Sequence, residues 1–475
     1  MENFVLSNLE PKSVFRFFEE LTRIPHGSGN TAAASEWAVR FAQERNLRHR
    51  RDEMGNVVIW KDASPGYEGH PAVILQGHLD MVCVKDPGVE HDFEKDPLKL
   101  TVDGGWIKAE GTTLGGDDGI AVAYMMALLD DGSIPHPPLE AVFTVDEEVG
   151  LLGAAGLDCA GLKGRMLINL DSEAEGIFTV GCAGGSRCDL ARAFPTVPGT
   201  GRVCRVAVQG LLGGHSGVDI NRGRANANKL LAQALSNLPN PRLISLHGGE
   251  QDNAIPNRAE AVVLLSASEV KGAAPFGGLD LDPALEPGFN GSMEPGELCE
   301  NVEALSVQDT RKVIGLLMDA PNGVQAMEPD LPGQVKTSLN LGILRLKDGA
   351  LNVTRSVRSS VAAEKEALVR KLQDLAAGCG ASFGRRGDYP AWAYRADSVL
   401  RETMVRVYRE QTGKEPQVVT IHAGLECGLF SEKLPGLDAV SIGPDMRDIH
   451  SPREMLSVSS VERMWRYLLK VLREL

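Results

Sequence analysis

Histidines and acidic residues occur together at five separate points of this sequence. They lie in Gly77-His78-Leu79-Asp80, Gly116-Asp117-Asp118-Gly119, Asp146-Glu147-Glu148, Asp171-Ser172-Glu173 and Asp448-Ile449-His450-Ser451. Imidazole and carboxylate groups without a cysteine ligand suit zinc, manganese or cobalt. If the fold brings these five segments together, they would form a metal site with carboxylates left over for acid–base chemistry.

The first four segments stand where a strand is expected to end or a helix to begin. Apolar runs at residues 72–75, 141–145 and 166–170 have the pattern of strands, and they lead into His78, Glu147 and Asp171. Residues 117–129 have the pattern of a helix that begins at Asp117. Because the carboxyl ends of strands in an open α/β sheet line the ligand crevice, we expect these segments to meet there.

The spacing of these residues indicates which of them could bind metal and which could accept a proton. His78 and Asp80 lie two residues apart on an extended segment, so both project to one side and Asp80 can hold the ring N–H of His78. Adjacent Glu147 and Glu148 point different ways, which leaves one for a metal and the other to take a proton from water. Asp117 opens a helix, where a carboxylate is favoured, and can bridge two ions.

The composition of the chain excludes several classes of function. The 475 residues, 43% of them hydrophobic and 24% charged, are typical of a folded protein of two or three domains. The net charge of −15 disfavours nucleic acid and membrane surfaces as partners. The longest apolar run, residues 120–129, is far shorter than the ~20 residues of a membrane helix. Eight scattered cysteines without a CxxC pair, and a start unlike a signal peptide, predict reduced thiols and a cytoplasmic location.

The order of the expected elements predicts an α/β catalytic domain with a mixed sheet, interrupted by an insertion. Residues 1–184 and 385–475 would form the catalytic domain, and residues 185–384 an inserted α+β lid or dimerisation domain. The insertion contains two strand–helix–strand groups, which suggests two similar halves. Between them, residues 272–300 are rich in Gly and Pro and are predicted to form a long surface loop or an internal linker.

The motifs resemble those of the co-catalytic di-zinc aminopeptidases and carboxypeptidases. More narrowly, the chain resembles the aminoacyl-histidine dipeptidases, also called Xaa-His or cytosolic non-specific dipeptidases. This rests on Gln76-Gly77-His78-Leu79-Asp80-Met81-Val82, Gly111-Thr112-Thr113-Leu114-Gly115, Pro321-Asn322-Gly323-Val324 and His422-Ala423-Gly424-Leu425-Glu426-Cys427-Gly428, and it extends over nearly the whole chain. One departure is Gly116-Asp117-Asp118, where the family more often has Ala and Asn at the first and third places, but Asp117 is retained.

The resemblance implies a di-zinc exopeptidase-like fold with two Zn²⁺ per chain, or Mn²⁺ or Co²⁺ in their place. The implied metal ligands are His78, Asp117 and Asp171 for one ion, and Asp117, Glu148 and His450 for the other. The implied catalytic residues are Glu147 as general base, Asp80 beside His78, and His215 of the insertion, which would stabilise the oxyanion. Asn253 and Arg358 would bind a small peptide substrate, and the Asp117–Asp118 peptide bond would be cis.

Four functions remain open on the sequence alone, one of which is exopeptidase action on peptides longer than dipeptides. The favoured one is hydrolysis of dipeptides by metal-activated water. A deacylase of N-acyl amino acids would use the same metal site, and a non-catalytic binding protein would use the same scaffold. Glu147 and all five ligand positions are intact, which favours an enzyme. A homodimer through the inserted domain is a further hypothesis, and a contact between Glu426 and a substrate ammonium group is a weaker one.

Overall fold

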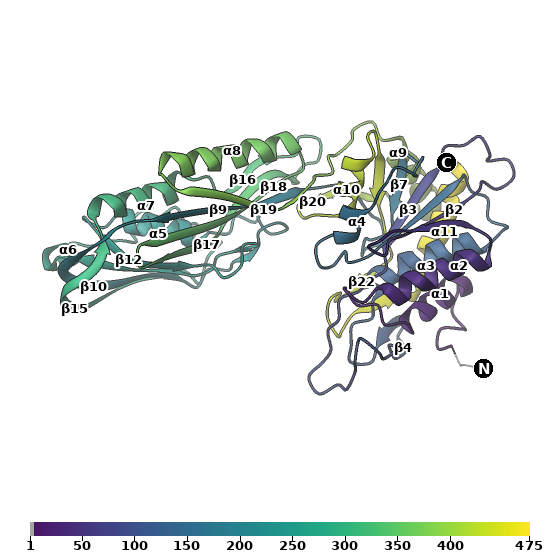
Figure 1. Ribbon diagram of the computed structural model, residues 1–475, viewed down its shortest axis with the longest axis horizontal. Helices are drawn as coiled ribbons and strands as arrows, with labels where there is room; N and C mark the ends of the chain where they lie inside the picture. The colour runs from purple at the N-terminus through teal and green to yellow at the C-terminus, as the bar shows by residue number, and fades with distance from the viewer. Residues whose placement is uncertain (1–3) are drawn as a thin grey trace. The chain divides into compact units, whose positions relative to one another are not determined.

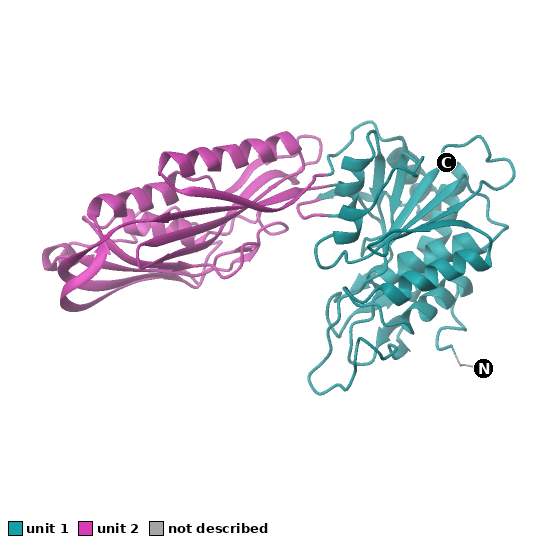
Figure 2. Ribbon diagram, in the orientation of Figure 1, with its two compact units in different colours: residues 1–181, 392–420, 425–475 teal, residues 182–391, 421–424 magenta. Residues whose placement is uncertain are grey.

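The computed structural model describes residues 4–475, which form two compact units (Figures 1 and 2). Unit 1 comprises residues 1–181, 392–420 and 425–475, and unit 2 comprises residues 182–391 and 421–424. Unit 2 is therefore an insertion into unit 1, and a short second segment of the chain also belongs to it.

Unit 1 is built on a mixed sheet of eight strands. Their order is β1 (Arg48–Arg51), β2 (Val57–Lys61), β6 (Leu139–Thr144), β3 (Val73–His78), β7 (Met166–Asn169), β21 (Asp438–Ser441), β8 (Ile177–Cys182) and β20 (Gln417–Ile421). Strands β6, β3, β7 and β21 run parallel. The strands predicted before Glu147, His78 and Asp171 are thus neighbours in one parallel block, and their carboxyl ends meet at one edge.

Burial explains why these strands read as continuous apolar runs. Every residue of β3 and of β6 is buried, as expected for parallel strands covered on both faces. The helix α3 (Gly116–Asp130) lies against β3 and α1 (Lys12–Thr22). Gly77 permits this close packing, because a Cβ there would lie 2.5 Å from Asp118 Oδ2 and 2.6 Å from Ala121 Cβ.

The other elements of unit 1 surround this sheet. They are α2 (Ala32–Glu44), α4 (Leu152–Gly156), α9 (Val399–Thr412), α10 (Glu426–Lys433) and α11 (Val458–Glu474), with a small sheet of β22 (Met446–Arg447), β23 (Met455–Ser457), β5 (Trp106–Ala109) and β4 (Leu100–Asp103). Helix α2 packs on β1 and β2, and α9 packs on β21 and α11. None of the helices in residues 4–475 is both long enough and apolar enough to span a bilayer.

Unit 2 is a second, mainly antiparallel sheet with helices on one face. Its strand order is β15 (Asn290–Leu305), β10 (Thr196–Gln209), β14 (Ala259–Leu265), β12 (Arg242–Gly248), β17 (Val335–Lys347), β18 (Ala350–Ser359), β9 (Gly184–Ala193) and β19 (Ser382–Tyr389), with β16 (Gly323–Met327) paired to β17. Helices α5 (Ala227–Ser236) and α7 (Val307–Asp319) cover one half and α8 (Ala362–Gly378) the other. A short pair, β11 (Gly214–His215) with β13 (Ala254–Ile255), and α6 (Ala267–Lys271) complete the unit.

The prediction of a surface loop or linker over residues 272–300 is wrong for residues 290–300. Residues from Asn290 onward belong to β15, a long edge strand that pairs with β10. Pro295 and Gly296 are tolerated because the register of the pair shifts between Arg202 and Cys204, beside Pro295. Pattern alone suggested a loop because a bulged edge strand needs few buried residues.

Candidate metal centre

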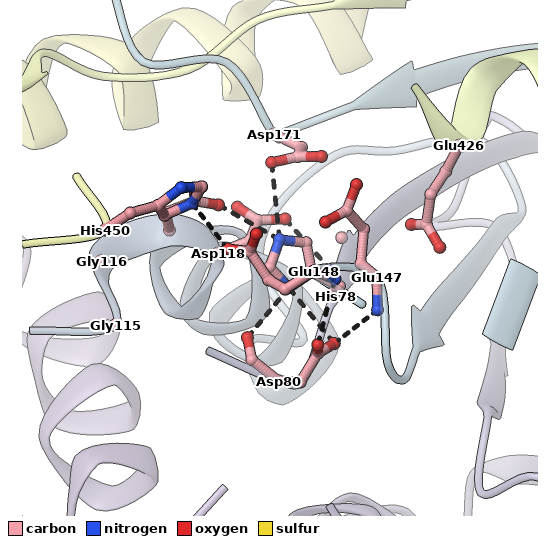
Figure 3. Close-up of polar contacts among 12 residues, drawn as sticks. His78, Asp80, Gly115, Gly116, Asp118, Glu147, Glu148, Asp171, Glu426 and His450 are labelled. Carbon is pink, nitrogen blue, oxygen red and sulfur yellow. Dashed lines mark hydrogen bonds and ion pairs between the residues drawn. The ribbon is translucent and has the colours of Figure 1, made fainter. Parts of the chain in front are cut away.

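Five elements of unit 1 bring the predicted metal-ligating residues to one place (Figure 3). His78 is the last residue of β3, Glu147 and Glu148 follow β6, and Asp171 follows β7. Asp117 is the second residue of α3, and the loop between β22 and β23 carries His450. The carboxyl edge of the parallel strands therefore collects the whole set, as the sequence predicted.

Asp117 lies between the two histidines. Its Oδ1 is 3.1 Å from His78 Nε2, and its Oδ2 is 3.1 Å from His450 Nε2. Each carboxylate oxygen thus faces a different imidazole. This is the arrangement required of a carboxylate that bridges two cations.

A further carboxylate stands beside each histidine. Asp171 Oδ1 is 3.7 Å from His78 Nε2. Glu148 Oε1 is 2.9 Å from His450 Nε2, the partner that the structure gives this buried oxygen. Each histidine thus has one carboxylate of its own, and both histidines share the carboxylate of Asp117.

Three groups of side chains are close enough to share an ion within the described residues: Asp117–Glu148–His450, His78–Asp118–Asp171 and His78–Glu147–Glu148. The first is one of the two predicted sets. The second contains Asp118 where the sequence suggested Asp117. Asp118 Oδ2 accepts a hydrogen bond from the backbone N–H of His78 at 3.1 Å, whereas Asp117 faces the His78 ring. The ring contact makes Asp117 the better candidate for the ion beside His78.

The electrostatics of the site fit a cation. Hydrogen bonds to Asp117 and then Glu148 raise the pKa of His450 to about 10. Burial alone would lower the pKa of His78, but hydrogen bonds to Asp117 and Asp80 raise it well above its usual value. In the protein alone, imidazolium charges therefore balance the carboxylates. Metal ions in the same positions would replace those protons.

Asp80 positions two neighbouring segments. The Nδ1 of His78 is 2.9 Å from the backbone carbonyl oxygen of Asp80 and 3.5 Å from its carboxylate. The Asp80 carboxylate accepts hydrogen bonds from the backbone N–H of Glu147 at 3.0 Å and of Glu148 at 3.3 Å, and from Ser28 Oγ at 2.8 Å. Asp80 therefore ties the His78 strand end to the turn that carries both glutamates, a role that spacing alone did not predict.

Glu454 holds the other side of the centre. Its buried carboxylate accepts hydrogen bonds from the backbone N–H groups of four successive residues, Leu114, Gly115, Gly116 and Asp117, at 2.7, 3.1, 2.8 and 3.3 Å. These are the donors that a helix start leaves unpaired. Sequence reasoning missed Glu454, and its only signal was its place four residues after His450.

Glu147 has the environment of a general base that can also release its proton. Burial, followed by the nearby charge of Glu426, raises the pKa of Glu147 to about 8 against the attraction of His78. Figure 3 shows its carboxylate beside those of the metal-ligand candidates. An acid of this strength can accept a proton from an activated water and later donate it.

Glu426 belongs to a buried polar network under the strand ends. Its Oε2 accepts hydrogen bonds from Thr144 Oγ1 at 2.7 Å and from Gln76 Nε2, while Gln76 Oε1 accepts one from Asn169 Nδ2 at 2.7 Å. Gln76, Thr144 and Asn169 each lie two or three residues before a predicted site residue. The network thus links β3, β6, β7 and α10 beneath the centre.

His215 and Arg358, predicted from the insertion, lie in unit 2 with Asn253. His215 Nδ1 accepts hydrogen bonds from the backbone N–H of Gly217 and of Val218, both at 3.2 Å, so the ring proton resides on Nε2. Burial and then Arg358 lower the pKa of His215, which keeps the ring neutral. Asn253 is exposed, and its backbone carbonyl accepts a hydrogen bond from Ser216 N at 2.7 Å.

Two further residues stand beside Arg358 that the sequence did not assign. Arg358 Nη1 donates to Tyr389 Oη at 2.8 Å, and Arg358 Nε is buried without a partner in the described part of the chain. His422 Nε2 is 2.7 Å from Ser338 Oγ. Burial and then Arg358 lower the pKa of His422 to about 3, so it is neutral. The His422 segment contributed to the resemblance, but nothing in its local pattern placed it in unit 2.

Comparison with known proteins now identifies the family. Residues 74–474 match the sequence model of peptidase family M20/M25/M40. The chain belongs to this family.

Several known proteins resemble the chain over nearly its full length. It is 37% identical over 481 residues to the cytosol non-specific dipeptidase of Escherichia coli K12, covering 99% of each chain. It matches the crystal structure of the aminoacylhistidine dipeptidase from Vibrio alginolyticus with a TM-score of 0.93 and 36% identity, over 99% of this chain and 98% of that one. Aminopeptidase PepT from Bacillus cereus shares the fold, with a TM-score of 0.58 and 16% identity over 98% of this chain and 99% of that one.

Proposed function

We propose that this M20-family protein hydrolyses dipeptides, Xaa-His dipeptides among them, with metal-activated water. The observation that carries the proposal is the position of Asp117, with one carboxylate oxygen 3.1 Å from His78 and the other 3.1 Å from His450. The names of the two relatives that align with nearly the entire chain support the choice of dipeptide substrates.

We assign two divalent ions to the centre, zinc first, with manganese or cobalt as alternatives. The proposed ligands are His78, Asp117 and Asp171 for one ion and Asp117, Glu148 and His450 for the other. Nitrogen and carboxylate ligands without thiolate suit these metals, and Glu148 Oε1 faces His450 Nε2 at 2.9 Å, so both groups can turn to one ion. Such ions would supply Lewis-acid activation of the attacking water and of the scissile carbonyl.

Glu147 is the proposed general base. Its carboxylate takes the proton of the attacking water and later delivers this proton to the leaving amine. The raised pKa of Glu147, about 8, suits both transfers. Asp80 acts as a positioning residue, because it orients the His78 ring through its carbonyl and the Glu147 turn through its carboxylate.

Three residues of unit 2 complete the proposed machinery. His215 has its Nε2–H free to stabilise the oxyanion that forms when the peptide carbonyl is attacked. Arg358 is the proposed anchor of the substrate's free carboxylate, because its Nε remains unpartnered among residues 4–475. Asn253, exposed next to β13, is a proposed substrate contact.

We also propose a cytoplasmic location and a homodimer through unit 2. The first is supported by the eight cysteines, none of which forms a disulfide bond within residues 4–475. The second is supported by β15, a long strand at the edge of its sheet whose outer backbone groups a second copy could pair. Light scattering coupled to gel filtration tests the dimer directly, and a monomer at every concentration would exclude it.

A substrate panel tests the activity. The purified protein is loaded with zinc, manganese or cobalt and assayed on dipeptides, tripeptides and N-acyl amino acids. Rapid cleavage of dipeptides is expected from the names of the two full-length relatives, and the carboxylate anchor would limit the substrate only on the C-terminal side of the scissile bond. Preference for N-acyl amino acids would establish the deacylase instead, and inactivity with both ions bound would leave a binding protein.

A further inference from the structure

One buried amide of unit 2 binds the backbone on both sides of Asn253. Asn340 of β17 is 1% exposed, and its Nδ2 donates to the carbonyl oxygens of Asp252 at 3.2 Å and of Ala254 at 2.7 Å. These two residues flank Asn253 in the chain. Both N–H groups of the amide are thus used, and the backbone that presents Asn253 is held at two points.

The same segment also holds the turn that carries His215. Ala254 pairs with His215 in the β11–β13 ladder, and the carbonyl of Asn253 accepts a hydrogen bond from the N–H of Ser216 at 2.7 Å. The position of His215 therefore depends on the segment that Asn340 binds. Two residues proposed to act on the substrate share this one support.

The partners of the Asn340 amide fix its orientation. Its Oδ1 accepts a hydrogen bond from Asn226 Nδ2 at 3.1 Å. Asn226 is in turn fixed as the N-cap of α5, because its own side chain accepts from the N–H groups of Asn228 and Lys229. A reversed Asn340 amide would turn its oxygen toward two carbonyl oxygens and its NH₂ toward the NH₂ of Asn226. Only one orientation therefore satisfies all the groups.

The motif Pro321-Asn322-Gly323-Val324, to which the proposed mechanism gives no role, supports the same part of β17. The Oδ1 of its asparagine accepts a hydrogen bond at 2.8 Å from the N–H of Leu341, the residue after Asn340. Gly342 comes next, and a Cβ there would lie 2.7 Å from both the Cα and the carbonyl oxygen of Asp252. Strand β17 and the segment before β13 thus touch at this point, which brings the Asn340 amide within reach of both carbonyls.

We propose that Asn340 is a positioning residue that fixes Asn253 and His215 for the hydrolysis of dipeptides. This rests on the proposed function, which makes Asn253 a substrate contact and His215 the donor to the oxyanion. Within residues 4–475 all hydrogen bonds of the Asn340 side chain go to two backbone carbonyls and to Asn226, so it acts through the residues that it holds. Misplacing a catalytic group by about 1 Å can cost ~100-fold in rate.

Asn340→Asp tests this role, because it keeps the size of the side chain but turns an oxygen toward the two carbonyls. In the metal-loaded enzyme the turnover number should fall by roughly 10–100-fold, since His215 is misplaced. The Michaelis constant for dipeptides should rise, since Asn253 is misplaced too. Metal content should not change, because the proposed ligands belong to unit 1. A folded Asn340→Asp with the kinetics of the wild type would overturn the proposal, whereas a metal-loaded wild type that cleaves no dipeptide would refute the proposed function instead.

Asn237 offers a matched control in the same unit. Its Nδ2 also donates to two carbonyls that flank one residue, those of Pro275 and Gly277, both at 3.0 Å. Asn237→Asp therefore removes the same kind of contact from a segment to which no part in the reaction is assigned, and it should leave both kinetic constants unchanged. If Asn237→Asp lowers the turnover number as much as Asn340→Asp does, the effect is general to unit 2 and the proposal is wrong.

A double variant distinguishes positioning from a general loss of structure. In a His215→Ala background, Asn340→Asp should lower the turnover number by less than twofold, because the group that Asn340 positions is already absent. Residues that act independently would instead give losses that multiply. An equal loss from Asn340→Asp in both backgrounds would overturn the proposal.

A crystal structure of the metal-loaded wild type with a non-hydrolysable dipeptide analogue needs no variant that folds. We expect Asn340 Nδ2 about 3 Å from both carbonyl oxygens while the analogue occupies the metal centre. If the segment before β13 has left Asn340 in that complex, Asn340 does not position it for the reaction.

Discussion

The carboxylate of Glu454 binds the backbone that delivers Asp117 to the centre of the site. It accepts hydrogen bonds from the N–H of Asp117 at 3.3 Å and from those of the three preceding residues. The same loop supplies His450, whose Nε2 lies 3.1 Å from the Asp117 carboxylate. One loop thus both provides a candidate ligand and fixes the direction of the carboxylate shared with it.

Glu454→Gln should therefore weaken metal binding although Glu454 touches no proposed ion. The amide oxygen can accept from only part of the four N–H groups, and its NH₂ faces the others. Partners that orient metal ligands typically contribute ~10–100-fold in affinity. Titration with zinc in a metal buffer measures this, and Glu402→Gln, an exposed carboxylate of α9, is the matched control. Unchanged affinity in Glu454→Gln would show that the backbone holds Asp117 without it.

Metal uptake should release protons and weaken as the pH falls. The hydrogen-bonded carboxylates raise the pKa of His450 to about 10 and the pKa of His78 well above its usual value, so both rings are protonated at neutral pH before metal binds. Each proton displaced should cost about tenfold in apparent affinity for every pH unit below neutrality. Calorimetry of zinc binding in buffers of different ionisation enthalpy counts these protons. Binding without proton release would contradict the assigned histidine ligands.

The site residues that could be predicted from the sequence are those that directly follow a recognisable strand. His78 directly ends the strand β3, and Glu147, Glu148 and Asp171 follow β6 and β7 within three residues. A local pattern of apolar run and acidic residue therefore locates them. The predicted helix at residues 117–129 was equally local, and α3 agrees with it.

The contacts that hold the site in place were not predictable, because they join distant parts of the chain. Glu454 and Asp117 are 337 residues apart, and His422 and Ser338 are 84 apart. No periodicity relates such pairs. The edge strand β15 was hidden for a related reason, since its stability comes from pairing with β10, which the composition of residues 290–300 does not reveal.

Glu147→Gln should separate catalysis from metal binding. The amide keeps the size of the side chain but cannot accept the proton, so the turnover number should fall by ~10²–10⁴-fold. Metal content should stay at two ions per chain, because Glu147 is not a proposed ligand. Glu148→Gln should instead lose metal, because Glu148 Oε1 stands 2.9 Å from His450 Nε2. If the two variants lose metal equally, Glu147 is a ligand, as its place in the group with His78 would allow.

Acid should destabilise unit 2 through His422. Burial and the neighbouring Arg358 lower the pKa of His422 to about 3, whereas the unfolded chain has a value near 6.5. A depressed pKa contributes stability above pH ~6.5 that is lost as the pH falls from there toward 3, at about 1.4 kcal/mol per pH unit. Urea unfolding at pH 7 and pH 5 should show a smaller loss for His422→Gln than for the wild type. His70→Gln, an exposed histidine, should not reduce the loss.

His215 is expected to stabilise the oxyanion of the reaction. His215 Nδ1 accepts two backbone N–H groups, so its Nε2–H is a fixed donor, and the lowered pKa keeps the ring neutral. If this donor meets the developing oxyanion, His215→Ala should lower the turnover number by ~10²–10³-fold, while metal content stays intact. Arg358→Met should mainly raise the Michaelis constant for free dipeptides, and a dipeptide amide should show little further loss, because its carboxylate is already absent. Steady-state kinetics on both substrates separates the two roles. A full turnover number in His215→Ala would remove His215 from the chemistry and leave it as a structural residue of the β11–β13 pair.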